Sequence, residues 1–360
     1  MSQSDEQAEK VTEGAVKRFL ARKDIEVSFQ RYAIDALSAM AQGLFASLLI
    51  GTIFNTIGNV SGATIFNDIG GFAQAMAGPA MACAIGHALK CPPLVLFSLI
   101  TVGYAANTAG GAGGPLSVLV IAIIAAELGK AVSKETKVDI LVTPAVTVGL
   151  GCALALLIGP WIGQVASAIG AFIMWATDLQ PFLMGVIVSV VVGVALTLPI
   201  SSAAICAALS LTGLAGGAAL AGCCAQMVGF AVASFRDNGW GGVVSQGLGT
   251  SMLQMGNIMR KPVIWVPAIV ASAVTGPVAT CVFTMQQNGP AIASGMGTCG
   301  LVGPIGLYAG WVSDSIVIGT VEWLGMALVC FVLPALVSWL MAFALRHAGI
   351  ITDGDMKLDA

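Results

Sequence analysis

Residues 234–257 read SFRDNGWGGVVSQGLGTSMLQMGN and lie between two long apolar segments, at roughly 222–235 and 262–284. The stretch combines one arginine, one aspartate, two asparagines and two glutamines with repeated glycines. Peptide groups that lack helical hydrogen bonds cannot face hydrocarbon, so they must be buried in protein or line a watery cavity. The stretch therefore indicates a broken or folded-back segment inside an otherwise apolar molecule.

The composition of the rest of the chain sets the class of protein. Hydrophobic residues make up 57% of the 360 residues and charged residues only 9%, whereas a soluble domain has about 25% charged residues. A β-barrel would show short alternating strands, but the runs here are long and rich in Ala, Gly, Leu and Val. We expect an all-α polytopic membrane protein in the lipid bilayer, without nucleic-acid partners. The ten expected crossings lie at roughly 33–57, 70–89, 93–108, 115–132, 139–158, 181–199, 202–220, 222–235, 262–284 and 316–345.

The basic residues predict the orientation of these crossings. Six of the fifteen lysines and arginines precede residue 32, and none lies between residues 138 and 235. By the positive-inside rule, both termini are expected in the cytoplasm. The chain then divides into a cytoplasmic amphipathic segment (1–30), a transmembrane domain (31–348) and a cytoplasmic tail (349–360). The first segment either rests on lipid or on the protein's own inner face, or is a partly ordered tail.

The polar stretch is the first candidate site. Asn238-Gly239 and Gly241-Gly242 predict a tight turn, which suggests a re-entrant hairpin. Amides and hydroxyls both donate and accept hydrogen bonds, as a polyhydroxylated solute requires. The alternative is an interfacial helix held near the cytoplasm by the flanking basic residues Arg236, Arg260 and Lys261. Polar side chains recur about four residues apart after the turn, which predicts one helix face: Gln246, Thr250, Gln254 and Asn257, with Asp237 and Asn238 just before them.

Two other glycine-rich clusters contribute candidates for substrate binding. Residues 106–115, ANTAGGAGGP, supply Asn107 and Thr108, and residues 288–306 supply Ser294 and Thr298. Ionisable residues inside a membrane span are costly and are by default functional candidates. Three side chains are therefore possible coupling or substrate contacts, each with a structural alternative: Glu322, His87 and Arg236.

Catalytic, metal and cofactor motifs are not found in the sequence. There is no GxxxxGK[ST], HExxH or GxSxG pattern, and the nine cysteines match no zinc or redox spacing. The two histidines, His87 and His347, are too few for a histidine-rich metal site. We therefore expect no cofactor, no metal and no catalytic residue in this chain.

The polar stretch and its neighbours together resemble a known family. FRDNGWGGVVSQGLGTSMLQMGNIMRKPVIWVPAIVASAVTGPVAT, with SGMGTCGLVGPIG downstream and LTLPISSAAI upstream, is similar to the membrane subunit (enzyme IIC) of bacterial sugar phosphotransferase systems. The likeness is strongest to the divergent branch of perfringolysin-regulator-like (PfoR-like) proteins, and it covers about residues 30–348.

The resemblance implies a homodimeric permease of the bacterial inner membrane, in which each subunit pairs a transport domain with a scaffold. It also implies that a separate IIB protein, supplied by IIA, phosphorylates the sugar at the inner face. One feature departs from better-known sugar IIC proteins, which carry a glutamate in a Gly-x-Thr-Glu type motif: here Thr298 is followed by Cys299. That departure puts coupling to phosphorylation in question.

Three hypotheses about function follow. The leading one is a IIC-type transporter that moves a sugar or related polar metabolite by alternating access. The second is an ion- or proton-coupled carrier of a small anion that uses Glu322 and Arg236. The third is a membrane-bound solute sensor whose basic N-terminal segment docks a cytoplasmic partner.

Overall fold

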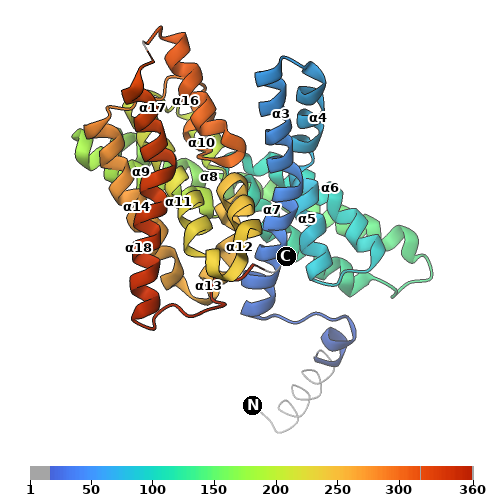
Figure 1. The fold of residues 1–360 in the computed structure, drawn as a ribbon. Helices are drawn as coiled ribbons and strands as arrows, with labels where there is room; N and C mark the ends of the chain where they lie inside the picture. The colour runs from blue at the N-terminus through green and yellow to red at the C-terminus, as the bar shows by residue number, and fades with distance from the viewer. Residues whose placement is uncertain (1–16, 317, 359–360) are drawn as a thin grey trace.

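The computed structural model describes residues 17–316 and 318–358, and helices joined by short loops make up most of this part of the chain (Figure 1). Within it the only β-type pairing is one isolated bridge between Gly213 and Gln287, so the all-α prediction is confirmed. The α-helices are α2 (Ala36–Leu44), α3 (Ile50–Ser61), α4 (Thr64–Ala75), α5 (Ala77–Ala88), α6 (Pro93–Gly110), α7 (Gly114–Val132), α8 (Asp139–Thr177), α9 (Pro181–Thr197), α10 (Ser202–Ala208), α11 (Gly213–Ala233), α12 (Phe235–Val244), α13 (Met255–Arg260), α14 (Val266–Pro277), α15 (Ala291–Ser294), α16 (Val302–Ser313), α17 (Thr320–Ala327) and α18 (Leu333–His347).

Short π-helical or 3-10 segments interrupt or extend these helices. They matter because the centre of the molecule is built largely from them. The π segments are η1 (Gln30–Asp35), η2 (Phe45–Leu49), η4 (Ser245–Gly249), η7 (Val278–Val282) and η9 (Leu328–Val332), and the 3-10 segments are η3 (Gly111–Gly113), η5 (Ser251–Gln254), η6 (Pro262–Trp265) and η8 (Cys299–Leu301).

The number of membrane crossings differs from the sequence prediction. Six helices of the described residues are long and apolar enough to cross a membrane, or seven if the bent α4–α5 pair forms one span. The ten expected crossings are therefore not confirmed. The region 181–235, for example, holds the 17-residue α9, the 7-residue α10 and α11, because the chain leaves helical geometry after Thr197 and after Ala208.

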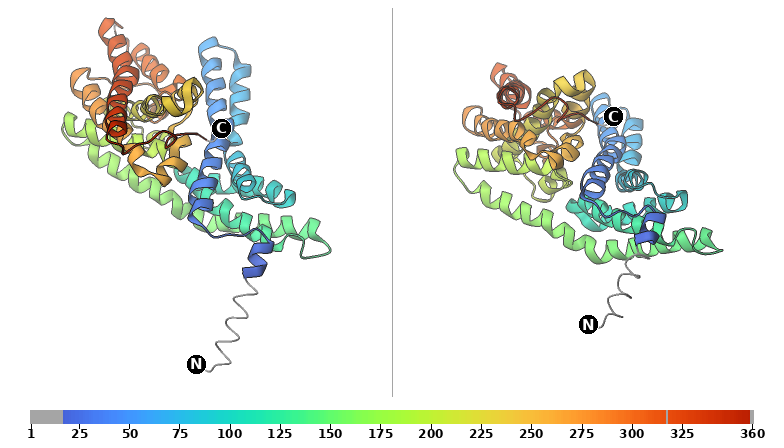
Figure 2. Two further views of the ribbon diagram at one scale, coloured as in Figure 1. Left: turned by 60° about the horizontal axis from the view of Figure 1, so that its bottom comes forward. Right: turned by 90° about the horizontal axis from the view of Figure 1, so that it is seen from below.

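The longest helix, α8, joins two groups of helices (Figure 2). It runs unbroken for 39 residues through Pro144 and Pro160, although the crossing expected there ended at about residue 158. Its first part packs on α6 and α7, which fold back on each other, since a methyl group on Gly129 of α7 would lie 2.8 Å from Val95 of α6. Its second part reaches α9 and α10.

Small residues allow the second group of helices to pack closely. A Cβ atom on Gly222 of α11 would lie 1.8 Å from the carbonyl oxygen of Ser189 in α9, so the two backbones are nearly in contact. The hydroxyl of Ser189 then donates to the carbonyl of Ser272 in α14 at 2.6 Å. Such small-residue contacts are the usual basis of helix association in membranes, and they fix α9 between α11 and α14.

One continuous helix, formed by η1, α2, η2 and α3, stands between the two groups (Figure 1). We call it the central helix. Its 30 residues from Gln30 to Asn59 span about 45 Å at 1.5 Å per residue, long enough to connect both faces of a membrane. The π-helical η2 lies at its middle.

Ion pairs gather at the end of the molecule where the central helix begins. This end, here called the basic face, includes the N-terminal arm, the C-terminal tail and the loop after α13. Lys130 is buried there beside Glu127, 2.9 Å away, and also donates to the carbonyl of Asp24 at 2.6 Å. The pairs are Lys130–Glu127, Arg31–Asp24, Arg260–Asp35, Lys261–Asp355 and Arg346–Asp237.

The N-terminal arm is described only from residue 17. Residues 17–22 are helical, and Lys23 then reaches the carbonyl of Ser133 and the carboxylate of Glu135. This contact holds the arm against the protein's own α7–α8 loop. The remainder of the expected amphipathic segment lies outside the described residues.

Candidate functional site

The central helix lines a cavity near each of its ends and a small one between them. The inner cavity, of about 240 Å³, adjoins the basic face and is bounded by Ser38, Gln42, Phe45, Ser245, Leu253, Asn257, Lys357 and Leu358. The outer cavity, of about 360 Å³, is lined by Thr52, Asn55, Thr56, Asn59, Gln74, Pro290, Ile292, Ala293, Met296, Val302, Ile305, Gly306 and Ala309. The middle cavity, of about 70 Å³, lies among Leu44, Leu48, Leu49, Pro115, Leu196, Ile200, Ser201, Ser202, Ala203, Thr250, Met252, Met296 and Cys299.

The outer cavity has one strongly polar wall. Four residues of the central helix, Thr52, Asn55, Thr56 and Asn59, recur at helical spacing along it. The amide of Gln74 in α4 donates to the hydroxyl of Thr52 at 3.0 Å. Within the described chain no hydrogen bond reaches the amides of Asn55 or Asn59, so these groups are open to a ligand.

Sequence reasoning missed this wall. Its signal was present in residues 52–59, TIFNTIGN, where polar residues at i, i+3, i+4 and i+7 interrupt a predicted apolar span. The candidate sites were sought at glycine-rich clusters, whereas this wall is a regular helix without a glycine-rich break.

Three irregular segments meet at the middle cavity. The backbone amide of Ser201, in the break between α9 and α10, donates to the carbonyl of Ala112 in the α6–α7 turn at 3.0 Å. The hydroxyl of Ser202 donates to the carbonyl of Gly295, in the turn before η8, at 2.7 Å. These hydrogen bonds satisfy the peptide groups of Ser201, Ala112 and Gly295, which lie in the irregular segments. The side chains around the cavity are mostly apolar, so it separates the two polar cavities.

A close contact between two π segments forms the constriction. A Cβ atom on Gly249 of η4 would lie 2.6 Å from the ring of Phe45 in η2, so the ring lies directly over the glycine. The hydroxyl of Thr298 donates to the carbonyl of Gly247 in the same π segment, and Gly300 packs against Ile53. Single π turns inside helices are common at functional sites, and these two contact each other between the inner and the outer cavity.

The predicted polar face of residues 246–257 is only partly formed. The amides of Gln246, Gln254 and Asn257 do meet: Gln254 donates to Gln246, and Asn257 donates to Gln254, both at 2.9 Å. We call these three residues, with Asn238, the amide cluster. Thr250 lies apart and lines the middle cavity. The single helix face that we expected is wrong, because Thr250 is extended (φ −155°, ψ 139°) between η4 and η5.

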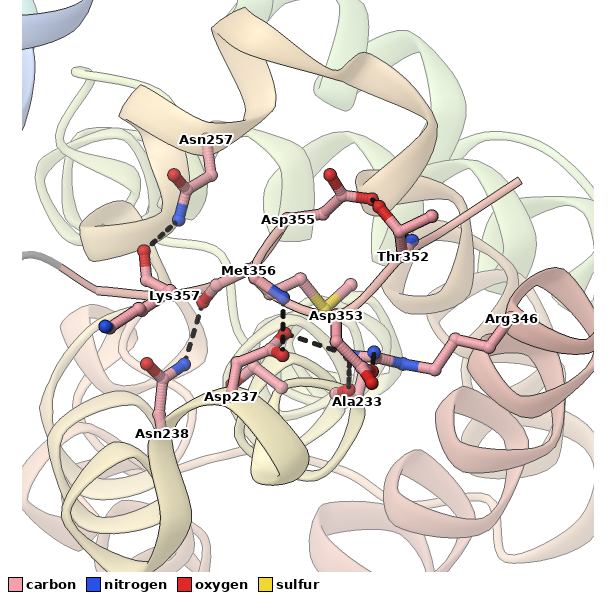
Figure 3. Close-up of polar contacts among 12 residues, drawn as sticks. Ala233, Asp237, Asn238, Asn257, Arg346, Thr352, Asp353, Asp355, Met356 and Lys357 are labelled. Carbon is pink, nitrogen blue, oxygen red and sulfur yellow. Dashed lines mark hydrogen bonds and ion pairs between the residues drawn. The ribbon is translucent and has the colours of Figure 1, made fainter. Parts of the chain in front are cut away.

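The amide cluster contacts the C-terminal tail (Figure 3), and Asn257 alone of its residues also borders the inner cavity. The side-chain amides of Asn238 and Gln254 both donate to the carbonyl of Met356, at 2.8 and 2.9 Å. The amide of Asn257 donates to the carbonyl of Lys357 at 2.8 Å. In return, the backbone amide of Leu358 donates to the carbonyl of Asn238 at 2.8 Å. The tail therefore satisfies the polar groups that we had assigned to a solute.

Acidic groups hold the same tail on both sides. Asp237 accepts from the backbone amide of Gly354 and from Arg346, each at 2.9 Å. Asp355 of the tail pairs with Lys261 at 2.6 Å. Partial burial alone would raise the pKa of Asp355, but the hydrogen bonds from Lys261 and Thr352 outweigh it and lower the pKa below its usual value. The carboxylate is therefore ionised at neutral pH.

The remaining predicted substrate contacts lie in separate places. Thr298 is fully buried at the constriction. Ser294 is equally buried and donates to the carbonyl of Leu211 at 2.7 Å. Asn107 and Thr108 lie in the last turns of α6, where Thr108 bonds its own helix at Tyr104, and neither lines the middle cavity. The structure therefore brings Thr250 and Thr298 to the passage and leaves Asn107 and Thr108 beside it.

The ionisable candidates lie away from the passage. Glu322 is in the first turn of α17, where its carboxylate accepts from the backbone amide of Gly319 at 2.8 Å. His87 lies exposed in the last turn of α5, and Arg236 lies exposed at the start of α12. Their roles in coupling stay predictions, and capping of the helix gives Glu322 a structural role of its own.

A family model describes nearly the whole chain. The model for the EIIC component of the phosphotransferase system matches residues 34–358, which include the central helix, the constriction and the tail. The chain belongs to this EIIC family. The match supports a membrane transport protein of phosphotransferase type, and it identifies the family without its branch. No curated protein and no solved structure matches the chain.

Proposed function

We propose that this EIIC protein is the permease subunit of a sugar phosphotransferase system and moves a sugar or related polyhydroxylated metabolite by alternating access. The observation that carries the proposal is the pair of cavities at opposite ends of one helix, each with polar side chains in its wall, separated by a mostly apolar constriction. A transporter that exposes its site to one side at a time needs this arrangement, and a sensor alone does not.

The basic face gives the direction. Lysines and arginines concentrate on the cytoplasmic side of membrane proteins, so the inner cavity opens to the cytoplasm and the outer cavity to the outside of a bacterial inner membrane. The same orientation places both termini in the cytoplasm. A separate IIB protein, charged by IIA, would meet the sugar at the inner cavity, and the family resemblance favours a homodimer.

The outer cavity supplies the chemistry for the first binding step. The free amides of Asn55 and Asn59 each offer donors and an acceptor, and the Gln74–Thr52 pair adds an orienting contact. A sugar loses several hydrogen bonds to water on binding, so the site must replace them. Neutral amides achieve this without the desolvation cost of a charge.

Passage inward requires the constriction to open. The ring of Phe45 must leave Gly249, and the hydrogen bond from Thr298 to Gly247 must break. Both changes fall on π segments, whose irregular hydrogen bonding offers an alternative register. The C-terminal group of helices would then move against the central helix.

Binding measurements on purified protein in lipid nanodiscs test the proposal. A panel of radiolabelled hexoses, pentoses, hexitols and disaccharides is titrated without any phosphoryl donor. Replacing Asn55 and Asn59 by alanine removes two neutral hydrogen bonds of about 0.5–1.5 kcal/mol each, so the Kd of the bound sugar should rise about 5- to 150-fold. Asn67→Ala, an amide outside the cavity, is the matched control. Absence of binding by the whole panel would reject the sugar assignment, and equal loss in the control would reject the site.

A further inference from the structure

The amide cluster and the tail form a complementary pair at the inner cavity. Three side-chain amides, from Asn238, Gln254 and Asn257, donate to carbonyls of residues 356 and 357, and Figure 3 shows the contacts of Asn238 and Asn257. The tail forms a turn over residues 353–356, and Lys357 and Leu358, which follow the turn, form part of the cavity wall. The tail thus lies where the inner cavity would otherwise meet the amides.

The amides of the cluster can bind hydroxyl groups as well as the peptide groups of the tail. Side-chain amides that donate to carbonyls bond equally well to hydroxyl groups. On the opposite side of the constriction, amides of the same kind, Asn55 and Asn59, have no protein partner in the described chain. Peptide groups of the tail therefore occupy, at the inner end, the positions that a hydroxyl-rich solute takes at the outer end.

Two buried side chains anchor the tail, and the polar contacts along the rest of it are ones that water or a solute can replace. Ile351 and Met356 are buried, with 1% and 0% of their surface exposed, and act as its anchors. The Lys261–Asp355 pair is partly exposed, and such pairs contribute little. Water or a solute can replace each lost hydrogen bond at a small net cost. By contrast, Asp237 and Arg346 pair within the body and remain when the tail leaves.

We propose that the amide cluster is a second, inward-facing solute subsite, and that residues 351–358 act as an internal competitor that covers it until the transporter opens to the cytoplasm. The ligand class is a neutral polyhydroxylated compound, the same as at the outer cavity, and this part of the inference rests on the proposed function. The covering of the cavity by the tail does not rest on it.

Cysteine labelling tests the cover without any solute. Ser245→Cys places a thiol in the inner cavity, and inside-out vesicles are treated with a membrane-impermeant maleimide. Deletion of residues 353–360 should raise its labelling rate about tenfold, the change expected for a closing free energy of about 1.4 kcal/mol. Asp355→Ala, which keeps the tail but removes one pair, should give a smaller rise. An exposed control, Lys137→Cys, should label equally in every background, and unchanged labelling of Ser245→Cys would overturn the proposal.

A reversible crosslink tests release during transport without deleting anything. The ammonium group of Lys261 in the body lies 2.6 Å from the carboxylate of Asp355 in the tail, so cysteines at these two positions, which lie outside the amide cluster, can be joined by a short bis-methanethiosulfonate. The crosslink should abolish uptake of the sugar that the wild type binds, and cleavage of the crosslink by a reductant should restore it. Equal uptake in both states would overturn release of the tail. Failure of the wild type to bind any sugar would instead reject the proposed function, and the labelling result would still decide the cover.

Discussion

The contact between α9 and α11 allows a sharp test of the packing that supports the passage. Gly222→Ala would place a methyl carbon 1.8 Å from the carbonyl oxygen of Ser189. Ordinary van der Waals contact begins at 3.4 Å, so one backbone must move by about 1.6 Å. The obstacle is a carbonyl group and not the end of a flexible side chain, so rotation cannot relieve it. Overpacking of this kind costs about 1–3 kcal/mol.

Thermal unfolding in detergent, followed by tryptophan fluorescence, measures the effect. Gly222→Ala should lower the midpoint by several degrees, since roughly 2–4 °C accompanies each kcal/mol in a chain of this order. Gly71→Ala is the matched control, because Gly71 also lies inside a helix but nothing approaches its Cβ position within 4 Å. It should be neutral or stabilise by up to about 1 kcal/mol, as alanine does in helices. Equal midpoints for the two variants would refute the close approach of α9 and α11.

Three further outcomes are expected. Cys299 lines the middle cavity, and Phe45→Ala should speed its reaction with a small methanethiosulfonate in membranes. Phe45→Leu, the control, should not. An unchanged rate in Phe45→Ala would mean that the ring does not close the passage. Lys130→Met should destabilise the protein by about 3 kcal/mol in thermal unfolding, because it leaves the carboxylate of Glu127 without its nearest cation, and Glu127→Gln in the same chain should recover part of the loss. The folded-state pKa of Asp355 is lowered, so the stabilisation of the tail by this carboxylate is complete above the ordinary aspartate pKa and is lost only as the pH falls through the folded value. The labelling rate of Ser245→Cys divided by that of the exposed Lys137→Cys, a ratio that cancels the ordinary pH dependence of a thiolate, should therefore stay flat between pH 8 and pH 5, and a rise of this ratio within that window would contradict the assignment.

The class of fold was readable from the sequence because it depends on composition. A chain with 9% charged residues cannot cover a water-facing surface, and long apolar runs without alternation require helices. The number of crossings was not readable in the same way. Hydropathy counts apolar residues but does not detect where the chain turns, so α8 runs well beyond the expected end of its crossing at residue 158, and the break after Ala208 divides the crossing expected at 202–220.

The candidate site was also predictable only in part from the sequence. Glycine and polar clusters located the irregular segments correctly, and Thr250 and Thr298 do reach the constriction. The helical spacing of residues 246–257 failed, because Thr250 leaves helical geometry between η4 and η5. The outer wall at residues 52–59 was overlooked since polar residues within a regular helix cause no visible break in the pattern.

The tail that binds the amide cluster lies about one hundred residues away in the sequence. This separation explains why the sequence did not show which groups bond to the amides. Local patterns show that Gln254 and Asn257 need hydrogen-bond partners; they do not show whether a solute or the chain itself provides them. In the structure the inner amides are satisfied by the tail, whereas Asn55 and Asn59 at the outer cavity have no partner in the described residues. An amide without a protein partner can bond a solute without first giving up another hydrogen bond, so we expect this conformation to bind a solute at the outer cavity more readily than at the amide cluster. The asymmetry follows from the chain's own hydrogen bonds, and release of the tail together with opening at Phe45 would reverse it.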